Sequence, residues 1–153
     1  MRLYLVRHGE AKPKEEDPER HLTLRGLAEA KMVAKFLKPL GLKIDAIWHS
    51  GKPRAAETAE AIAPAVQLVE GLEVRPDLAP EDDVLPVARE IQRGGKDLMI
   101  VGHLPFLDCL ASQLLVKDAE AELIEFRKGA VVCLDYGDDR AWRLAWMITP
   151  EIL

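Results

Sequence analysis

The sequence lacks any long hydrophobic run, and this absence limits where the protein can reside. No segment approaches the ~18 consecutive apolar residues needed to cross a bilayer. The first apolar segment also cannot serve as a secretory signal, because Arg7 and His8 interrupt it too early. We therefore expect a soluble protein with no membrane partner.

Cysteine is scarce as well. The two cysteines, Cys109 and Cys133, both lie in apolar surroundings, which is typical of small core residues. So few thiols cannot build a disulfide framework, and their setting does not indicate a metal site. Free cysteines used in this way are typical of a reducing compartment, so we expect a cytoplasmic location.

Basic charge is also in short supply. The chain has 21 Lys and Arg against 26 Asp and Glu, for a net charge of −5. This balance argues against a nucleic-acid partner, although it does not exclude a local basic pocket. With 48% hydrophobic and 31% charged residues, the composition is that of a globular protein. A length of 153 residues, without repeats, predicts a single domain covering 1–153.

Short apolar segments alternate with amphipathic ones along most of the chain. The pattern predicts strands at 3–6, 44–49, 67–69 and 98–101, and helices that start near Thr23, Pro53, Asp82 or Asp83, and Pro105. The charged, proline-containing segment 12–20 predicts an exposed loop. Strands that alternate with helices form mainly parallel sheets covered on both faces. We therefore expect an α/β fold with three layers.

The C-terminal part departs from this alternation. Segments 130–136 and 141–148 flank a turn at 137–139, which predicts an antiparallel hairpin at one edge of the sheet. Within its second strand, large apolar residues occur at every second position. We expect these four side chains to share one face: Trp142, Leu144, Trp146 and Ile148.

Polar side chains follow three of the predicted strands. Arg7 and His8 end the first strand, Arg54 begins the helix after the second, and His103 follows the third. The carboxyl ends of parallel strands meet at one edge of a sheet, so these side chains can converge. Arginine forks bind phosphate oxygens, and a helix start such as that at Arg54 favours an anion. The sequence therefore predicts a phosphate pocket that contains two histidines.

Such a pocket can perform phosphoryl transfer. A neutral imidazole can attack phosphorus to form a phosphohistidine, and neighbouring arginines favour that neutral form. A second, protonated imidazole can stabilise the transition state. No carboxylate cluster has the pattern expected for magnesium. We therefore expect neither a metal ion nor a cofactor.

These residues resemble the motifs of the histidine phosphatase superfamily, which has the phosphoglycerate-mutase-like fold. The resemblance rests on Arg7-His8-Gly9, on the segment 50–58 with its Arg-Ala pair, and on Gly102-His103. Within the superfamily, the chain is similar to the short bacterial phosphohistidine phosphatases of the SixA type. That similarity rests on the small size and on the segments 22–26, 103–105 and 146–150. The resemblance spans essentially the whole chain.

The resemblance implies a role for each pocket residue. His8 is the expected nucleophile, and Arg7, Arg54 and His103 are the expected ligands of the phosphoryl group. Arg20 is a further candidate for substrate binding at the pocket rim, with an exposed loop charge as the equal alternative. The resemblance assigns no such role to three other residues, which we expect to be structural or exposed: His21, His49 and Thr58.

One departure from the family bears on the substrate. Many superfamily members carry a glutamate acid soon after a leucine in this region, whereas Leu78 is followed here by Ala79 and Pro80. The absence of a dedicated acid disfavours alkoxide leaving groups, which need a proton to depart. Imidazole, with a pKa of about 6.5, leaves with less help. The departure therefore favours phosphohistidine in a protein as the substrate.

Two alternatives stay open at this point. Three nearby carboxylates could supply the acid for a small phosphate monoester, although helix capping and solvation are the expected roles of Glu81, Asp82 and Asp83. The chain could also be a phosphate-binding or phosphoprotein-binding module without turnover. The presence of all four pocket residues counts against that reading. The pattern predicts no oligomeric state.

Overall fold

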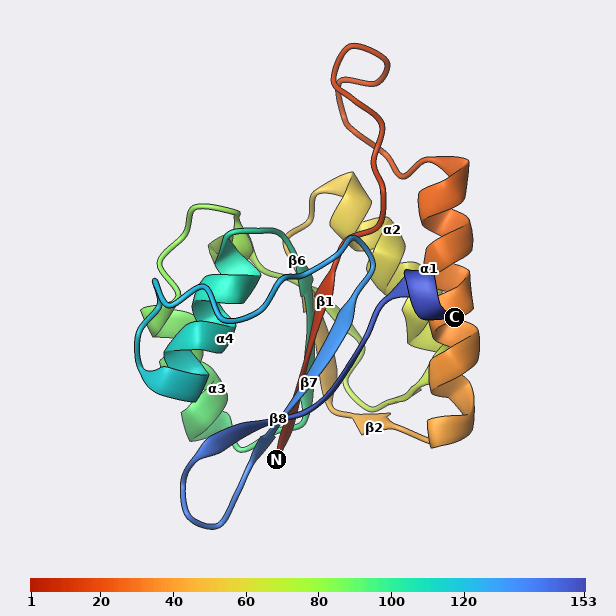
Figure 1. The fold of residues 1–153 in the computed structure, drawn as a ribbon. Coiled ribbons are helices and arrows are strands. Elements are labelled where there is room, and N and C mark those ends of the chain that lie inside the picture. The colour runs from red at the N-terminus through yellow and green to blue at the C-terminus, as the bar shows by residue number, and fades with distance from the viewer.

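The computed structural model describes residues 1–153 and contains a six-stranded sheet between two layers of helices (Figure 1). The strands of this sheet are β1 (Arg2–Arg7), β3 (Ala46–His49), β5 (Leu72–Val74), β6 (Leu98–Gly102), β7 (Val131–Tyr136) and β8 (Trp142–Ile148). Their spatial order is β5-β3-β6-β1-β7-β8. A separate two-stranded sheet pairs β2 (Lys43–Ile44) with β4 (Gln67–Leu68).

Four α-helices cover the main sheet: α1 (Leu24–Leu37), α2 (Pro53–Ile62), α3 (Leu85–Gly94) and α4 (Phe106–Val116). Helices α1 and α2 lie on one face, and α3 and α4 lie on the other (Figure 1). Short 3-10 turns occur as η1 (Lys38–Leu40), η2 (Ala63–Ala65), η3 (Pro76–Leu78) and η4 (Pro150–Ile152). None of the helices combines the length and apolar character needed to cross a membrane. The predicted three-layer α/β fold is confirmed.

The helix starts follow from local chemistry. The Thr23 side chain accepts a hydrogen bond from the Gly26 N–H and so caps α1, as predicted. Pro53 occupies the first position of α2, where its missing N–H costs nothing. The start of α3 differs slightly from the prediction, because Val84 rather than an aspartate takes the N-cap position. Asp83 nevertheless accepts a hydrogen bond from the Leu85 N–H.

The strand directions determine where the site is built. Strands β1, β6, β3 and β5 are parallel, so their carboxyl ends lie at one end of the sheet. Strands β7 and β8 continue the sheet as an antiparallel hairpin. Between β1 and α1 the chain leaves the body of the protein at this same end (Figure 1). We call residues 12–21 the projecting loop; an Ala11–Leu22 bridge closes its base.

The prediction of a single apolar face on β8 is wrong. A β-bulge shifts the register between β7 and β8, so that Cys133 pairs with Trp146 while Leu134 pairs with Leu144. Because neighbouring residues of β7 point to opposite faces, their partners on β8 do so too. Trp142 therefore packs in the core beneath α3 and α4, whereas Ile148 packs in the core beneath α1 and α2.

Candidate active site

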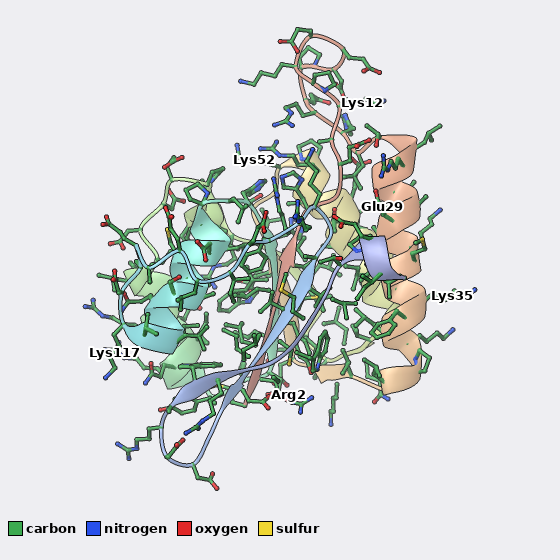
Figure 2. The ribbon with its side chains drawn as sticks, viewed as in Figure 1. Arg2, Lys12, Glu29, Lys35, Lys52 and Lys117 are labelled. Carbon is green, nitrogen blue, oxygen red and sulfur yellow. The ribbon has the colours of Figure 1, made fainter.

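A cavity of about 290 Å³ lies at the carboxyl ends of β1 and β6. The structure brings all five predicted site residues to this cavity. Its lining consists of Arg7, His8, Ala11, Arg20, Arg54, Pro80, His103, Leu104 and Lys128. Four of these side chains are cations that can bind anions, two are imidazoles, and none carries a carboxylate. In Figure 2, Lys12 and Lys52 lie at this end of the molecule and Arg2 lies at the opposite end.

His8 follows directly on β1, and its ring is held in one orientation. Its Nδ1 lies 2.7 Å from the Gly9 carbonyl oxygen. A carbonyl only accepts hydrogen bonds, so Nδ1 carries the proton and Nε2 keeps its lone pair. Burial lowers the pKa of His8 to about 4 against the opposing effect of the Gly9 bond, and the charges of Arg54 and Arg7 lower it further. His8 is therefore neutral at pH 7, with Nε2 free to attack.

His103 follows β6 and is 1% exposed. Its Nε2 lies 2.6 Å from the Ser50 hydroxyl oxygen, whereas its Nδ1 is buried without a partner. Ser50 Oγ also accepts the Lys52 N–H, so its own proton is available to Nε2 and the ring proton falls to Nδ1. Burial, followed by the charge of His8, lowers the pKa of His103 to about 3. Its Nδ1–H is thus a donor without an acceptor in the protein.

The two arginines beside the histidines also have unused donors. Arg7 Nη1 donates to the Phe126 carbonyl at 2.8 Å, but Arg7 Nε is buried without a partner, as is Arg54 Nε. Burial lowers the pKa of both guanidinium groups, which remain charged at pH 7. Arg54 is the second residue of α2, where the helix dipole favours an anion. Buried donors without acceptors are rare and costly, so this arrangement fits an anion-binding site.

A hydrogen bond to α2 positions Gly9. The Gly9 N–H donates to Thr58 Oγ1 at 3.0 Å, and the Thr58 hydroxyl donates to the Arg54 carbonyl at 2.7 Å. A Cβ on Gly9 would lie 3.0 Å from the Gly26 carbonyl oxygen, and one on Gly26 would lie 2.2 Å from the Glu10 carbonyl oxygen. The two glycines therefore permit α1 to pack directly against the chain that carries His8.

Three residues that build the site were not predicted from the sequence as part of it: Ser50, Thr58 and Lys128. Ser50 directly follows β3, so its position at a strand end was an available signal. Thr58 lies four residues after Arg54 on α2 and therefore shares its face, which is also a readable signal. Lys128 comes from a loop without any local pattern, and only the tertiary fold brings it to the cavity.

The remaining candidates lie outside the cavity. Neither Asp82, which accepts the Ala79 N–H, nor Asp83 lines it, and the exposed Glu81 does not line it either. His49 Nδ1 accepts the Gly51 N–H, and His21 Nδ1 binds Asp17. No group of three or more His, Cys, Asp or Glu side chains is arranged to hold a metal ion.

The chain is similar to known histidine phosphatases both in sequence and in structure. Residues 3–79 match the family model of the histidine phosphatase superfamily (branch 1). The chain is 30% identical to phosphohistidine phosphatase SixA of Escherichia coli strain K12, over 98% of this chain and 94% of that protein. The structure of the protein histidine phosphatase SixA complexed with tungstate superposes with a TM-score of 0.86 at 25% identity, over 99% of both chains. A structure from Agrobacterium tumefaciens that carries the SixA name gives 0.78 at 26% identity, over 97% of both.

Proposed function

This chain belongs to the histidine phosphatase superfamily, and from this premise we propose that it hydrolyses phosphohistidine in a protein through a covalent intermediate on His8. One observation carries the proposal. The cavity is lined by a neutral imidazole nucleophile and by three residues with buried donors that lack acceptors, while no carboxylate lines it. The nucleophile and the anion ligands are thus both available, and a dedicated acid is not.

In the first step, Arg7, Arg54 and His103 bind the oxygens of the phosphoryl group. The lone pair of His8 Nε2 attacks phosphorus, and the bond between phosphorus and the substrate nitrogen breaks. That electron pair returns to the substrate ring, which carries a proton on its other nitrogen and therefore leaves as neutral imidazole. Neutral imidazole needs little help from an acid of the protein, because its conjugate acid has a pKa of about 6.5. The products are a free histidine in the substrate and a phosphoryl group on His8.

In the second step, water attacks the phosphorus bound to His8. The bond between phosphorus and Nε2 breaks, its electron pair returns to Nε2, and the proton released by the water goes to solvent. The net reaction converts phosphohistidine and water into histidine and inorganic phosphate. Arg7, Arg54 and the imidazolium that His103 forms beside the phosphoryl dianion supply the positive charge, so we propose that no metal ion is required.

The choice of a protein substrate is supported by the name of the Escherichia coli relative and by that of the protein histidine phosphatase solved with tungstate, a tetrahedral oxyanion like phosphate. We further propose that residues 1–153 act as one domain, since both apolar cores share a single sheet. The cytoplasmic location expected from the free cysteines Cys109 and Cys133 stays a prediction.

The test is a comparison of substrates with a matched inactive variant. Wild type and His8→Ala are assayed on a phosphohistidine protein, phosphoramidate and sugar phosphates, each with and without a chelator. We expect preference for the phosphohistidine protein, no effect of chelation, and an acid-labile phosphate label that His8→Ala lacks. Faster turnover of small monoesters would overturn the substrate, and an unlabelled wild type would overturn the nucleophile.

A further inference from the structure

Arg20 belongs to the projecting loop, yet its side chain lines the cavity at the body of the protein. Its backbone has φ of 55°, in the left-handed region that side chains other than glycine seldom occupy. The Arg20 Nε donates to the Lys12 carbonyl at 3.0 Å, across the loop, and Lys12 is labelled on that loop in Figure 2. The two terminal nitrogens of Arg20 have no hydrogen-bond partner in the protein and remain available to a ligand.

The carboxylate of Asp17 fastens the chain on both sides of Arg20. Asp17 Oδ1 accepts the Glu19 N–H at 3.1 Å, and Oδ2 accepts the His21 N–H at 2.9 Å. The same Oδ2 lies 2.8 Å from Nδ1 of the His21 ring. The Asp17 carbonyl in turn accepts the Arg20 N–H at 2.9 Å. Both backbone neighbours of Arg20, and Arg20 itself, are therefore tied to one residue.

We propose that Asp17, together with His21, is a positioning residue that holds Arg20 in the cavity as a third arginine ligand of the phosphoryl group. The inference rests on the proposed function only in that the cavity must bind a tetrahedral anion. Asp17 does not touch that anion, because it does not line the cavity. It acts through the backbone of Arg20.

The electrostatics of the cavity explain why Arg20 needs to be held. Its charge lies close enough to lower the pKa of Arg54, of His8 and of His103. Without a bound anion these like charges repel, so an unrestrained arginine would turn towards solvent. Because Asp17 binds the loop from outside the cavity, it restrains Arg20 without neutralising the positive charge that the phosphoryl group requires. The loop thus maintains an arrangement that only an anion makes favourable.

The ring of His21 gives this restraint a dependence on pH. The groups that face it are acidic: Asp17 at 2.8 Å and Glu19 at 3.6 Å from the same loop, and Glu57 from α2. The hydrogen bond with Asp17 raises the pKa of His21, while the pKa of Asp17 itself falls to about 2. The ionic contact is therefore complete below the ordinary pKa of histidine. The contact is lost as the pH rises through the raised pKa of His21.

Tungstate binding tests the proposal without any turnover, and calorimetry measures it. We expect Arg20→Ala to weaken tungstate about tenfold and Asp17→Asn about fivefold, as for charge-assisted contacts. The double variant should bind no more weakly than Arg20→Ala alone, because Asp17 acts only through Arg20. Glu15→Gln is the matched control: it removes the same charge from an exposed side chain of the same loop that makes no hydrogen bonds, and should bind as wild type does.

Additive losses in the double variant would overturn the proposal, as would wild-type affinity in Asp17→Asn. His21→Gln supplies a second, milder variant. Relative to it, wild type should lose affinity from about pH 6 to pH 9, where tungstate keeps its charge and His21 titrates. If the affinity for tungstate varied with pH in the same way in wild type and in His21→Gln, the role of His21 would be overturned. Failure of the proposed function has a different signature, since tungstate would bind normally while phosphohistidine would not be hydrolysed.

Discussion

The imidazole rings of His8 and His103 lie with their centroids 5.1 Å apart and their planes tilted by 52°. Two protonated rings at this distance would repel each other strongly in a buried site. In the anion-free protein both stay neutral, because burial lowers the pKa of each ring. A phosphoryl dianion between them allows His103 to take up a proton while His8 keeps its lone pair. The pair thus separates into a nucleophile and a cation only when substrate is present.

The free energy of unfolding of the anion-free protein should therefore decrease at acid pH. The pKa of His8 is 6.5 in the unfolded chain and about 4 in the folded one, so the unfolded chain binds more protons between these values. Stability falls as the pH drops through this range, by ~3 kcal/mol for His8 alone. Urea unfolding between these pH values, on wild type and His8→Gln, measures the effect.

The variant should show a flatter pH dependence than wild type. His21→Gln is the matched control, because the pKa of His21 is raised and that ring is already charged throughout the acid range. Equal slopes for wild type and His8→Gln would contradict the neutral, buried state of His8.

Ser50 should increase kcat by holding His103 in the orientation and tautomer that the reaction requires. Ser50→Ala removes the hydroxyl that lies 2.6 Å from Nε2, so His103 loses the contact that assigns the ring proton to Nδ1. We expect kcat to fall about tenfold, as for loss of a positioning hydrogen bond worth ~1 kcal/mol or somewhat more, with little change in KM. Steady-state kinetics on a phosphohistidine peptide measures both. Ser50→Thr keeps a hydroxyl and should recover most of the rate; a Thr variant as slow as Ala would refute this role.

Thr58 should contribute both to the free energy of unfolding and to the orientation of His8. Thr58→Val preserves the shape but leaves the buried Gly9 N–H without an acceptor, which costs about 1–3 kcal/mol. Gly9, whose carbonyl orients His8, would also lose this hydrogen bond to α2. Chemical denaturation measures the first effect, and the rate of labelling of His8 measures the second. Thr58→Ser retains the hydroxyl and serves as control; a Val variant as stable as wild type would show that Gly9 finds another partner.

Local chemistry explains why much of this fold could be read from the sequence. The Thr23 cap, the Pro53 start and the apolar strand that ends on Arg7 are each dictated by neighbouring residues. Parallel strands then bring Arg54 and His103 to the same end of the sheet without further assumptions. These features needed only the parallel direction of the strands, which the alternation of strands and helices predicts.

What could not be predicted depends on contacts between distant segments. The bulge between Cys133 and Leu134 has no local signal, and it divides the aromatic residues of β8 between two cores. Whether Arg20 reached the cavity was undecided, because its left-handed backbone is set by Asp17 and is rare for arginine. Lys128 reaches the cavity only because β7 follows the loop that packs on Arg7.

Arg54 should show a conflict between stability and function. In the anion-free protein its Nε is buried without an acceptor, and the charges of Arg7 and Arg20 lie nearby. Arg54→Met removes both penalties and keeps the apolar stem, so the variant should melt about 2–4 °C higher for each kcal/mol regained. Tungstate at about 100 times its Kd should add ~2.7 kcal/mol to wild type and almost nothing to the variant.

Thermal unfolding with and without tungstate measures both effects of Arg54→Met. Arg89→Met is the matched control, since Arg89 is exposed on α3 and makes no ion pair or hydrogen bond. That control should melt as wild type does and keep the full response to tungstate. If Arg54→Met melts below wild type without tungstate, then contacts within the protein hold Arg54 in place. A higher melting temperature means that the arginine is retained at a cost to stability, because the anion requires it.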